Sequence, residues 1–103
     1  MLDKEKVRQI AEIYAIEVRK SLNPAYIILF GSYVNGTPHE WSDIDIAVIV
    51  NDFAGDWLDT ASLLCRLSRN VNIDIEPHLM DEQHDPSGFL EHIKKTGEVI
   101  YAT

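Results

Sequence analysis

Basic residues are scarce in this sequence of 103 residues, which holds 9 lysines and arginines against 17 aspartates and glutamates. The formal net charge of −8 gives the chain no general attraction for a phosphate backbone, so we do not expect a nucleic-acid-binding surface. The shortage is most marked in the middle of the chain, because no lysine or arginine occurs between Lys20 and Arg66. An anion bound in that stretch needs other groups to neutralise it.

Cysteine and long apolar segments are also scarce. A single cysteine, Cys65, excludes an intramolecular disulfide and favours a reducing compartment. Residues 1–20 are charged throughout and do not form the apolar core of a signal peptide, and no apolar run approaches the length of a membrane span. We therefore expect a cytoplasmic protein without a membrane partner, folded as one domain over residues 1–103.

Apolar residues recur at steps of three and four in three stretches, which predicts amphipathic helices. The first covers residues 3–22, with Asp3 as its N-cap. The second covers residues 55–70, and its expected buried face consists of Trp57, Leu58, Ala61, Leu64, Cys65 and Leu67. The third opens at Asp85 and is closed by Gly97.

Shorter apolar stretches between these helices predict strands. Residues 25–30 form a continuous apolar run, and residues 43–50 alternate before turning wholly apolar, as expected of strands covered by helices. Residues 71–77 alternate between apolar and polar side chains, and residues 98–101 add a last short strand. The polar segment 31–42 predicts a turn or short helix followed by a loop. This order predicts an α/β (α+β) fold in which helices pack on a small mixed sheet.

A glycine–serine pair, Gly31-Ser32, directly follows the first predicted strand. The glycine permits a sharp turn, and the amides of a helical turn starting there, together with the Ser32 hydroxyl, would favour a phosphate group. Pairs of this kind are also common in turns that bind nothing. The pair alone therefore does not separate a phosphate site from a structural turn.

Two carboxylates, Asp43 and Asp45, stand two residues apart at the start of the next predicted strand. Residues i and i+2 of a strand point to the same face, so the two side chains converge and repel each other unless a cation lies between them. Magnesium prefers oxygen ligands and commonly bridges carboxylates to phosphates, which favours a magnesium site. The alternative is that Asp43 caps a turn and Asp45 is a solvated residue at the end of the strand.

A second acidic pair, Asp74 and Glu76, lies in the predicted strand 71–77 and can add a third carboxylate if the two strands are neighbours. We favour Asp74, because Ile73 and Ile75 anchor it within the strand, whereas Glu76 lies near the strand end. The choice between the two stays open. So does the alternative that both belong to an exposed acidic sheet face.

Gly31-Ser32, ten intervening residues and Asp43-x-Asp45 match the signature of the polymerase-β-type nucleotidyltransferase superfamily. The chain resembles in particular the minimal nucleotidyltransferases (MNT type), antitoxins often found in prokaryotes beside a helical partner of the HEPN type. Residues 73–75 resemble the strand that contributes the third carboxylate. The resemblance covers residues 25–77, and it identifies the superfamily rather than the substrate.

The resemblance implies transfer of a nucleoside monophosphate, AMP from ATP, to a hydroxyl acceptor such as a tyrosine of a HEPN-type partner toxin. Asp43 and Asp45 would hold two Mg²⁺ ions about 3.5–4 Å apart, and one of the ions would also be held by Asp74. Gly31 and Ser32 would fix the β- and γ-phosphates. Whether Asp74 also acts as a general base stays open.

The match has one departure, because Asn35 stands where close relatives commonly have arginine. Arg66 or Arg69 could help to neutralise a triphosphate, although a surface position is favoured for both. We therefore expect a partner to complete the site, either a HEPN-like protein or a second copy of this chain. The competing hypothesis is a catalytically weak or inactive protein of this fold that docks on and masks a helical partner.

Trp41 is expected to anchor its loop or to stack on a nucleobase. The four histidines show no zinc-ligand spacing.

Overall fold

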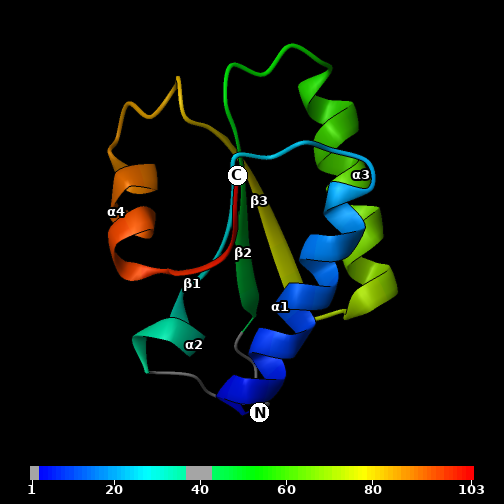
Figure 1. The fold of residues 1–103 in the computed structure, drawn as a ribbon, viewed down its shortest axis with the longest axis vertical. Coiled ribbons are helices and arrows are strands. Elements are labelled where there is room, and N and C mark those ends of the chain that lie inside the picture. Colours follow the sequence, from blue (N-terminus) through cyan, green and yellow to red (C-terminus); the bar gives the residue numbers. More distant parts are fainter. Residues whose placement is uncertain (1–2, 37–42) are drawn as a thin grey trace.

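The computed structural model describes residues 3–36 and 43–103, in which helices and strands alternate along the chain (Figure 1). The elements are α1 (Lys4–Arg19), β1 (Tyr26–Phe30), α2 (Ser32–Asn35), β2 (Ile44–Val50), α3 (Trp57–Val71), β3 (Ile75–Asp81), α4 (Phe89–Thr96) and β4 (Glu98–Ala102). None of the helices in these two ranges is both long and apolar enough to cross a membrane. The prediction for Trp41 falls outside the described residues.

A four-stranded sheet in the order β3-β2-β1-β4 forms the middle layer. Strand β1 is antiparallel to both β2 and β4, whereas β2 and β3 run parallel. Helices α1 and α3 cover one face of the sheet, and α4 covers the other (Figure 1). The predicted α/β architecture with a small mixed sheet is confirmed.

Strand β2 is buried on both faces, which explains its continuous apolar run. Ile46 and Val48 belong to the core beneath α1 and α3. The intervening Ala47 and Ile49 belong to the smaller core beneath α4. Because side chains alternate along a strand, Asp45 lies on the face that α4 covers.

Carboxylates cap the two long helices, as predicted for the first of them. Asp3 accepts a hydrogen bond from the amide of Lys6 at 2.8 Å, and Asp56 accepts one from the amide of Asp59 at 2.9 Å. These bonds satisfy amides that have no partner inside the helix. Helix α1 ends at Arg19, short of the predicted end at residue 22.

The start of α4 differs from the prediction. The helix begins at Phe89 rather than at Asp85, and Gly88 is its N-cap residue. Asp85 still caps the helix from the preceding loop, because its carboxylate accepts hydrogen bonds from the amides of Leu90 and Glu91 at 3.1 and 3.2 Å. The capping signal at Asp85 therefore predicted the helix but placed its first turn too early.

Strand β3 begins and ends four residues later than predicted, since it covers Ile75–Asp81. The predicted range 71–77 was therefore wrong at its start and at its end. Helix α3 continues to Val71, and Ile73 is 84% exposed instead of anchoring a strand. The side chain of Asn72 accepts a hydrogen bond from the amide of Asp74 at 2.8 Å, which stabilises a turn between the helix and the strand. The apolar and polar residues that alternate before Ile75 belong to the end of α3 and to the turn that follows it, and not to a strand.

The predicted buried face of α3 was wrong at three positions, because Trp57, Leu58 and Cys65 are exposed. The buried residues of the helix are Leu64 and Ser68. Helix α3 packs against α1 and β3, and that packing covers a narrower stripe than the apolar periodicity indicated.

Pro77 is compatible with β3 because this strand lies at the edge of the sheet. The amide of Ile44 donates to the carbonyl of Asp74, and the amide of Glu82 donates to the carbonyl of Val50, both at 2.8 Å. Alternate residues of a strand bond to the same neighbour, so the even-numbered residues of β3 bond to β2. Pro77 therefore directs its missing N–H away from the sheet.

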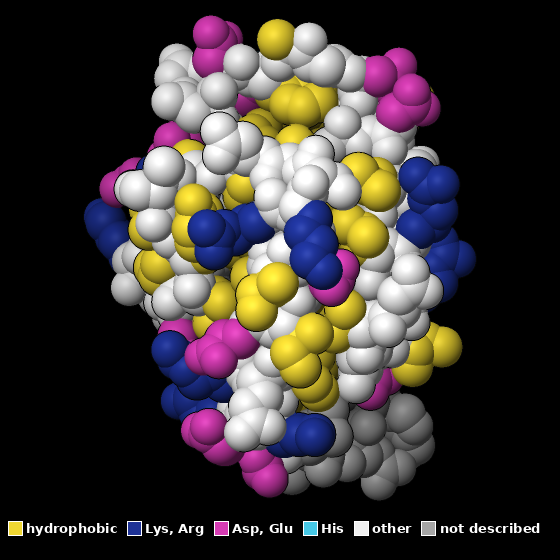
Figure 2. Space-filling model, turned by 45° about the vertical axis from the view of Figure 1, so that its right-hand side comes forward, with side chains coloured by type: hydrophobic (Ala, Val, Ile, Leu, Met, Phe, Trp, Pro, Cys, Tyr) yellow, Lys and Arg dark blue, Asp and Glu magenta, His cyan; other side chains and the backbone are white. Residues whose placement is uncertain are grey.

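The outer surface of α1 and α3 is partly apolar. Figure 2 shows apolar side chains among charged ones on this side of the molecule. Ile13 and Ile16 of α1 are 52% and 56% exposed, and a groove between the two helices also contains Leu67 and Val71. The inner faces of these helices close the core, while apolar residues remain on their outer faces.

Asp81 connects the loop after β2 to the end of β3 through hydrogen bonds. Its carboxylate accepts hydrogen bonds from the amides of Gln83, Phe53 and Asp52 at 2.9, 3.0 and 3.2 Å. The bonds from Gln83 and Phe53 are the main cause that holds the pKa of Asp81 below its usual value.

We predict that Asp81→Asn lowers the free energy of unfolding at about pH 7, and that the difference from wild type shrinks as the pH falls. A carboxylate whose pKa is lower in the folded state stabilises the fold above its unfolded pKa of about 3.9 and loses this contribution as the pH falls through the folded value. Urea unfolding of both proteins at several pH values between about 3 and about 7 measures the difference. An equal loss across this range would contradict the role assigned to the charge.

Candidate active site

Segments from three parts of the chain meet at one edge of the sheet, where β1 ends and β2 and β3 begin (Figure 1). At this edge Phe30 lies opposite Asp45, and Asp45 lies opposite Glu76. Helix α2 follows β1 directly, with Gly31 as its N-cap residue. The predicted turn and the acidic residues of the other two segments therefore converge.

Asp45, Glu76 and His78 form a compact group on the face that α4 covers. Asp45 and Glu76 are partners across the parallel pair of strands, and His78 is the partner of Ala47. One potential ligand atom of each of the three side chains lies within 4.8 Å of the others, and His78 Nε2 is 3.2 Å from Asp45 Oδ1. The side chains of Asp45 and His78 are 23% and 32% exposed, so solvent and ligands can reach the group.

The carboxyl groups of Glu76 and Asp43, the residue immediately before β2, lie close enough to form a hydrogen bond when one of them is protonated. This hydrogen bond is the main cause that raises the pKa of Glu76 above its usual value. Partial loss of hydration and repulsion by Asp45 and Asp43 add to the increase, although Glu76 is largely exposed, and the nearby His78 opposes it. Three carboxyl groups thus share a small volume, and this set of oxygen donors is one that a hard divalent cation fits.

Gly31 provides the space that Asp45 occupies. Its backbone has φ +86° and ψ −153°, a region that is essentially restricted to glycine. A Cβ atom at this position would lie 2.4 Å from Asp45 Oδ2. The absence of a side chain at Gly31 therefore lets the turn and the carboxylate lie in direct contact.

The two remaining predicted site residues have different surroundings. Ser32 is the first residue of α2 and is half-buried. Asp74 is exposed, precedes β3 and belongs to the turn after α3. Glu76, the alternative in the sequence analysis, is the residue that lies opposite Asp45. The role of Asp74 stays a prediction, and the geometry favours Glu76 as the third carboxylate.

A hollow of about 260 Å³ lies beside this group, between the end of β1 and α4. Phe30 packs edge-on against His78 and Phe89, with ring centroids 5.0 and 6.0 Å apart. The hollow is lined by Phe30, Gly31, Phe89, His92, Ile93 and Thr96. A planar ring bound there would contact aromatic side chains and lie next to the predicted phosphate turn.

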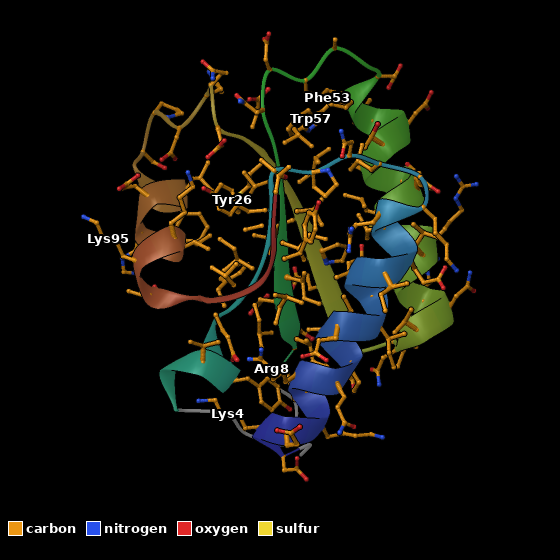
Figure 3. The ribbon with its side chains drawn as sticks, viewed as in Figure 1. Lys4, Arg8, Tyr26, Phe53, Trp57 and Lys95 are labelled. Atoms are coloured by element: carbon orange, nitrogen blue, oxygen red, sulfur yellow. The ribbon has the colours of Figure 1, made fainter. Side chains whose placement is uncertain are left out.

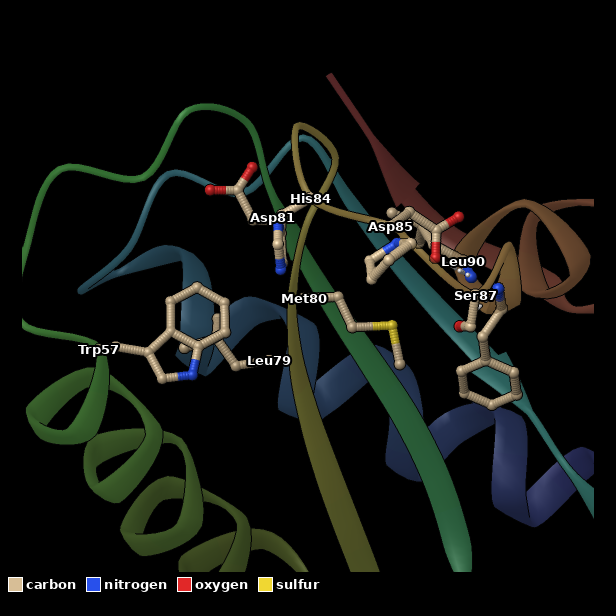
Figure 4. A pocket seen from close by; sticks show the side chains of 10 residues that line it. Trp57, Leu79, Met80, Asp81, His84, Asp85, Ser87 and Leu90 are labelled. Atoms are coloured by element: carbon tan, nitrogen blue, oxygen red, sulfur yellow. Dashed lines mark hydrogen bonds between the residues drawn. The ribbon is translucent and has the colours of Figure 1, made fainter.

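A second hollow, of about 440 Å³, lies at the other end of β3 (Figure 4). Its walls include Trp57, Met80 and His84. Asp81, which also lines it, is the last residue of β3, whereas Glu76 lies near the first. The second hollow and the carboxylates therefore lie at opposite ends of the strand, and we do not assign the hollow to the candidate site.

Arg66 and Arg69, the basic side chains that the sequence analysis considered as phosphate ligands, lie away from the carboxylates. Arg66 and Arg69 belong to α3, which packs on the opposite face of the sheet. Arg8 lies at the end of α1 that is close to α2 (Figure 3) and is paired with Glu12 and Glu98. The predicted shortage of positive charge near the turn thus gains no compensation from Arg66 and Arg69.

The model of the polymerase beta nucleotidyltransferase family matches residues 8–103. The chain belongs to this family. The matched region includes both the Gly31-Ser32 turn and the acidic residues of β2 and β3, and the sequence-based prediction of a nucleotidyltransferase is confirmed. A comparison with curated proteins gives no match.

Several solved structures share the fold of this nucleotidyltransferase. A candidate nucleotidyltransferase from Sulfolobus solfataricus has a TM-score of 0.69 and 20% identity, over 96% of this chain and 83% of that one. A toxin–antitoxin structure with AMP-PNP has a TM-score of 0.66 and 28% identity, over 89% and 73% of the two chains. The complex of a tri-AMPylated HEPN toxin from Shewanella oneidensis with an MNT antitoxin gives 0.62 and 24%, over 93% and 73%. The predicted resemblance to minimal nucleotidyltransferases of toxin–antitoxin systems is thereby confirmed.

Two features of the site were missed by the sequence analysis of this nucleotidyltransferase. His78 was dismissed for lack of zinc-ligand spacing, yet it shares a strand face with Glu76 two residues earlier, and that spacing was the available signal. The pairing of Phe30 with Phe89 had no such signal, because the two residues come together only through the packing of α4 on the sheet.

We predict that Gly31→Ala destabilises the nucleotidyltransferase by roughly 1–3 kcal/mol and weakens its binding of divalent cations, because the new methyl group displaces the Asp45 carboxylate. Denaturant unfolding and titration with Mn²⁺ measure the two effects. Gly36→Ala is the matched control, since Gly36 also has a positive φ, of 78°, but a Cβ atom there would meet nothing within 4 Å. Equal loss of cation binding in both variants would refute the importance of the contact.

Proposed function

We propose that this nucleotidyltransferase is metal-dependent and transfers AMP from ATP to a hydroxyl group of a partner protein. The observation that supports this most strongly is the position of Asp45 opposite Glu76 on neighbouring parallel strands. Asp43 extends the acidic group through its bond to Glu76, and Gly31 places the predicted phosphate turn against Asp45.

The donor set supports Mg²⁺ as the cation. Asp43, Asp45 and Glu76 provide carboxylate oxygens, which are the ligands that Mg²⁺ prefers. The raised pKa of Glu76 comes mainly from its hydrogen bond with Asp43, and a divalent cation between the two carboxyl groups would take the place of the proton that they share. Asp74, as first predicted, is the alternative to Glu76 in this set.

Each residue then has a defined task. Asp43, Asp45 and Glu76 hold two cations, which when bound would offset the charge of the triphosphate and lower the pKa of the acceptor hydroxyl. Gly31 keeps the approach to Asp45 free of side-chain atoms, and together with Ser32 it fixes the β- and γ-phosphates.

The aromatic hollow supports a position for the nucleobase. Phe30 lines the hollow and lies opposite Asp45 in the sheet, so a nucleotide whose phosphates contact the turn at Gly31 can direct its base toward Phe89. Stacking on aromatic side chains contributes about 1–3 kcal/mol per base.

The acceptor that we propose is a tyrosine of a HEPN-type protein. The similar complex from Shewanella oneidensis contains a tri-AMPylated HEPN toxin, which supports both the transferred group and the kind of partner. The partner would also supply positive charge, because the chain has no lysine or arginine between Lys20 and Arg66. A second copy of this chain is the other possible source of that charge.

The same shortage of positive charge favours a second candidate function. A nucleotidyltransferase fold that binds triphosphate weakly could act by docking on a helical partner and masking it. In this case the carboxylates would be dispensable for activity. Incubation with labelled ATP and Mg²⁺, with and without a HEPN-type partner, separates the two functions, because masking alone transfers no label.

We predict that Asp45→Asn and Glu76→Gln each reduce AMP transfer by roughly 100-fold or more, because a bound metal ion contributes several kcal/mol to such a reaction. Asp74→Asn is the matched control and should lower transfer far less, since Asp74 precedes β3, whereas Glu76 lies opposite Asp45 within it. Label transfer from ATP to the partner measures the rates. Loss of transfer in Asp74→Asn with full activity in Glu76→Gln would reverse the assignment.

We predict that Phe89→Ala weakens binding of a non-hydrolysable ATP analogue by roughly tenfold, through loss of stacking in the hollow. Phe89 is 48% exposed, so the substitution should disturb the fold little. Isothermal titration calorimetry in the presence of Mg²⁺ measures the affinity. Leu58→Ala, an exposed apolar residue of α3, is the control. Unchanged affinity in Phe89→Ala would place the base elsewhere.

A further inference from the structure

His78 lies where a ligand of a bound cation would have to lie. It follows Glu76 by two residues on β3 and shares its face, and its partner across the strands, Ala47, has too small a side chain to separate it from Asp45. His78 Nε2 is 3.2 Å from Asp45 Oδ1. Phe30 also packs edge-on against the ring.

We propose that His78 is a nitrogen ligand of the cation that Asp45 and Glu76 hold. This inference rests on the proposed metal site and extends it, because the carboxylates alone would form an all-oxygen site. It also assigns a function to a histidine that the three-carboxylate mechanism does not use.

The spacing of the three side chains fits a single ion. Ligands of an octahedral ion with bonds of about 2.1 Å lie roughly 3 Å apart when adjacent and roughly 4 Å apart when opposite. The potential ligand atoms of Asp45, Glu76 and His78 lie within 4.8 Å of one another. The distance of 3.2 Å between His78 Nε2 and Asp45 Oδ1 is that of a hydrogen bond in the absence of an ion, and it is also close to the separation of adjacent ligands.

A nitrogen ligand changes which cations the site prefers. Imidazole suits transition-metal ions better than it suits Mg²⁺, whose natural ligands are oxygens. The site should therefore bind Mn²⁺ and Co²⁺ more tightly, relative to Mg²⁺, than a site formed by Asp43, Asp45 and Glu76 alone. This preference is a property of binding and does not depend on which acceptor the enzyme uses.

Pulsed electron paramagnetic resonance on the chain of 103 residues with one equivalent of Mn²⁺ tests the proposal directly. Wild-type protein should show modulation from a directly bound ¹⁴N nucleus, and this signal should change to that of ¹⁵N when the protein is made with ¹⁵N-labelled histidine. His78→Gln should abolish the histidine signal and weaken Mn²⁺ binding roughly tenfold, with a smaller change for Mg²⁺. His84→Gln, which changes an exposed histidine at the other end of β3, is the matched control and should behave as wild type.

The outcomes separate this inference from the proposed function. Mn²⁺ that binds through Asp45, as shown by loss of binding in Asp45→Asn, but gives no histidine nitrogen signal in wild type would refute the role of His78 and leave the metal site intact. Absence of Mn²⁺ binding with and without an ATP analogue would refute both. The isotope experiment needs no substitution, so the absence of a histidine nitrogen signal refutes the proposal even if His78→Gln does not fold.

Discussion

The parallel pairing of β2 with β3 is the constraint on which the candidate site depends. Its register sets Asp45 opposite Glu76 and Ala47 opposite His78, so residues from two distant segments share one face of the sheet. Asp43 adds a third carboxyl group at the same edge through its bond to Glu76. Repulsion within this group opposes the pairing unless a proton or a cation lies between the oxygens, and the fold thereby couples sheet register to ion binding.

One face of the sheet holds most of the hydrophobic core, and the other holds the candidate site. The face beneath α1 and α3 contains most of the buried core, including Tyr14, whose hydroxyl donates a hydrogen bond to the carbonyl of Leu64 at 2.9 Å. The face beneath α4 has a smaller core and leaves room at one edge for the carboxylates, the turn at Gly31 and the aromatic hollow. Arg66 and Arg69 lie on the face of the sheet that α1 and α3 cover. They therefore cannot contact a phosphate bound on the face that α4 covers. A site rich in negative charge and poor in arginine is the physical basis for proposing that a partner takes part.

Most of the fold could be predicted from the sequence, because burial leaves a periodic pattern. The apolar run of β2, the stripe of α1 and the cap at Asp3 all have local signals, and the Gly-Ser and Asp-x-Asp spacing identified the family. The choice of third carboxylate depends instead on where β3 begins. A hydrogen bond between the Asn72 side chain and the amide of Asp74 keeps that segment in a turn, and alternation of residue types does not reveal such a bond. The exposed positions on α3 and the hollow beside Phe89 likewise depend on how helices pack.

The central claim, that Asp43, Asp45 and Glu76 form a cation site beside the turn at Gly31, is tested most directly by anomalous diffraction. Crystals of the full chain would be soaked with Mn²⁺ and a non-hydrolysable ATP analogue, and an anomalous difference map would locate the ions. We expect Mn²⁺ peaks at bonding distance, about 2.2 Å, from the carboxylates of Asp45 and Glu76. Peaks bound through Asp74 without Glu76, or no peak at this edge of the sheet when the analogue is bound, would contradict the account.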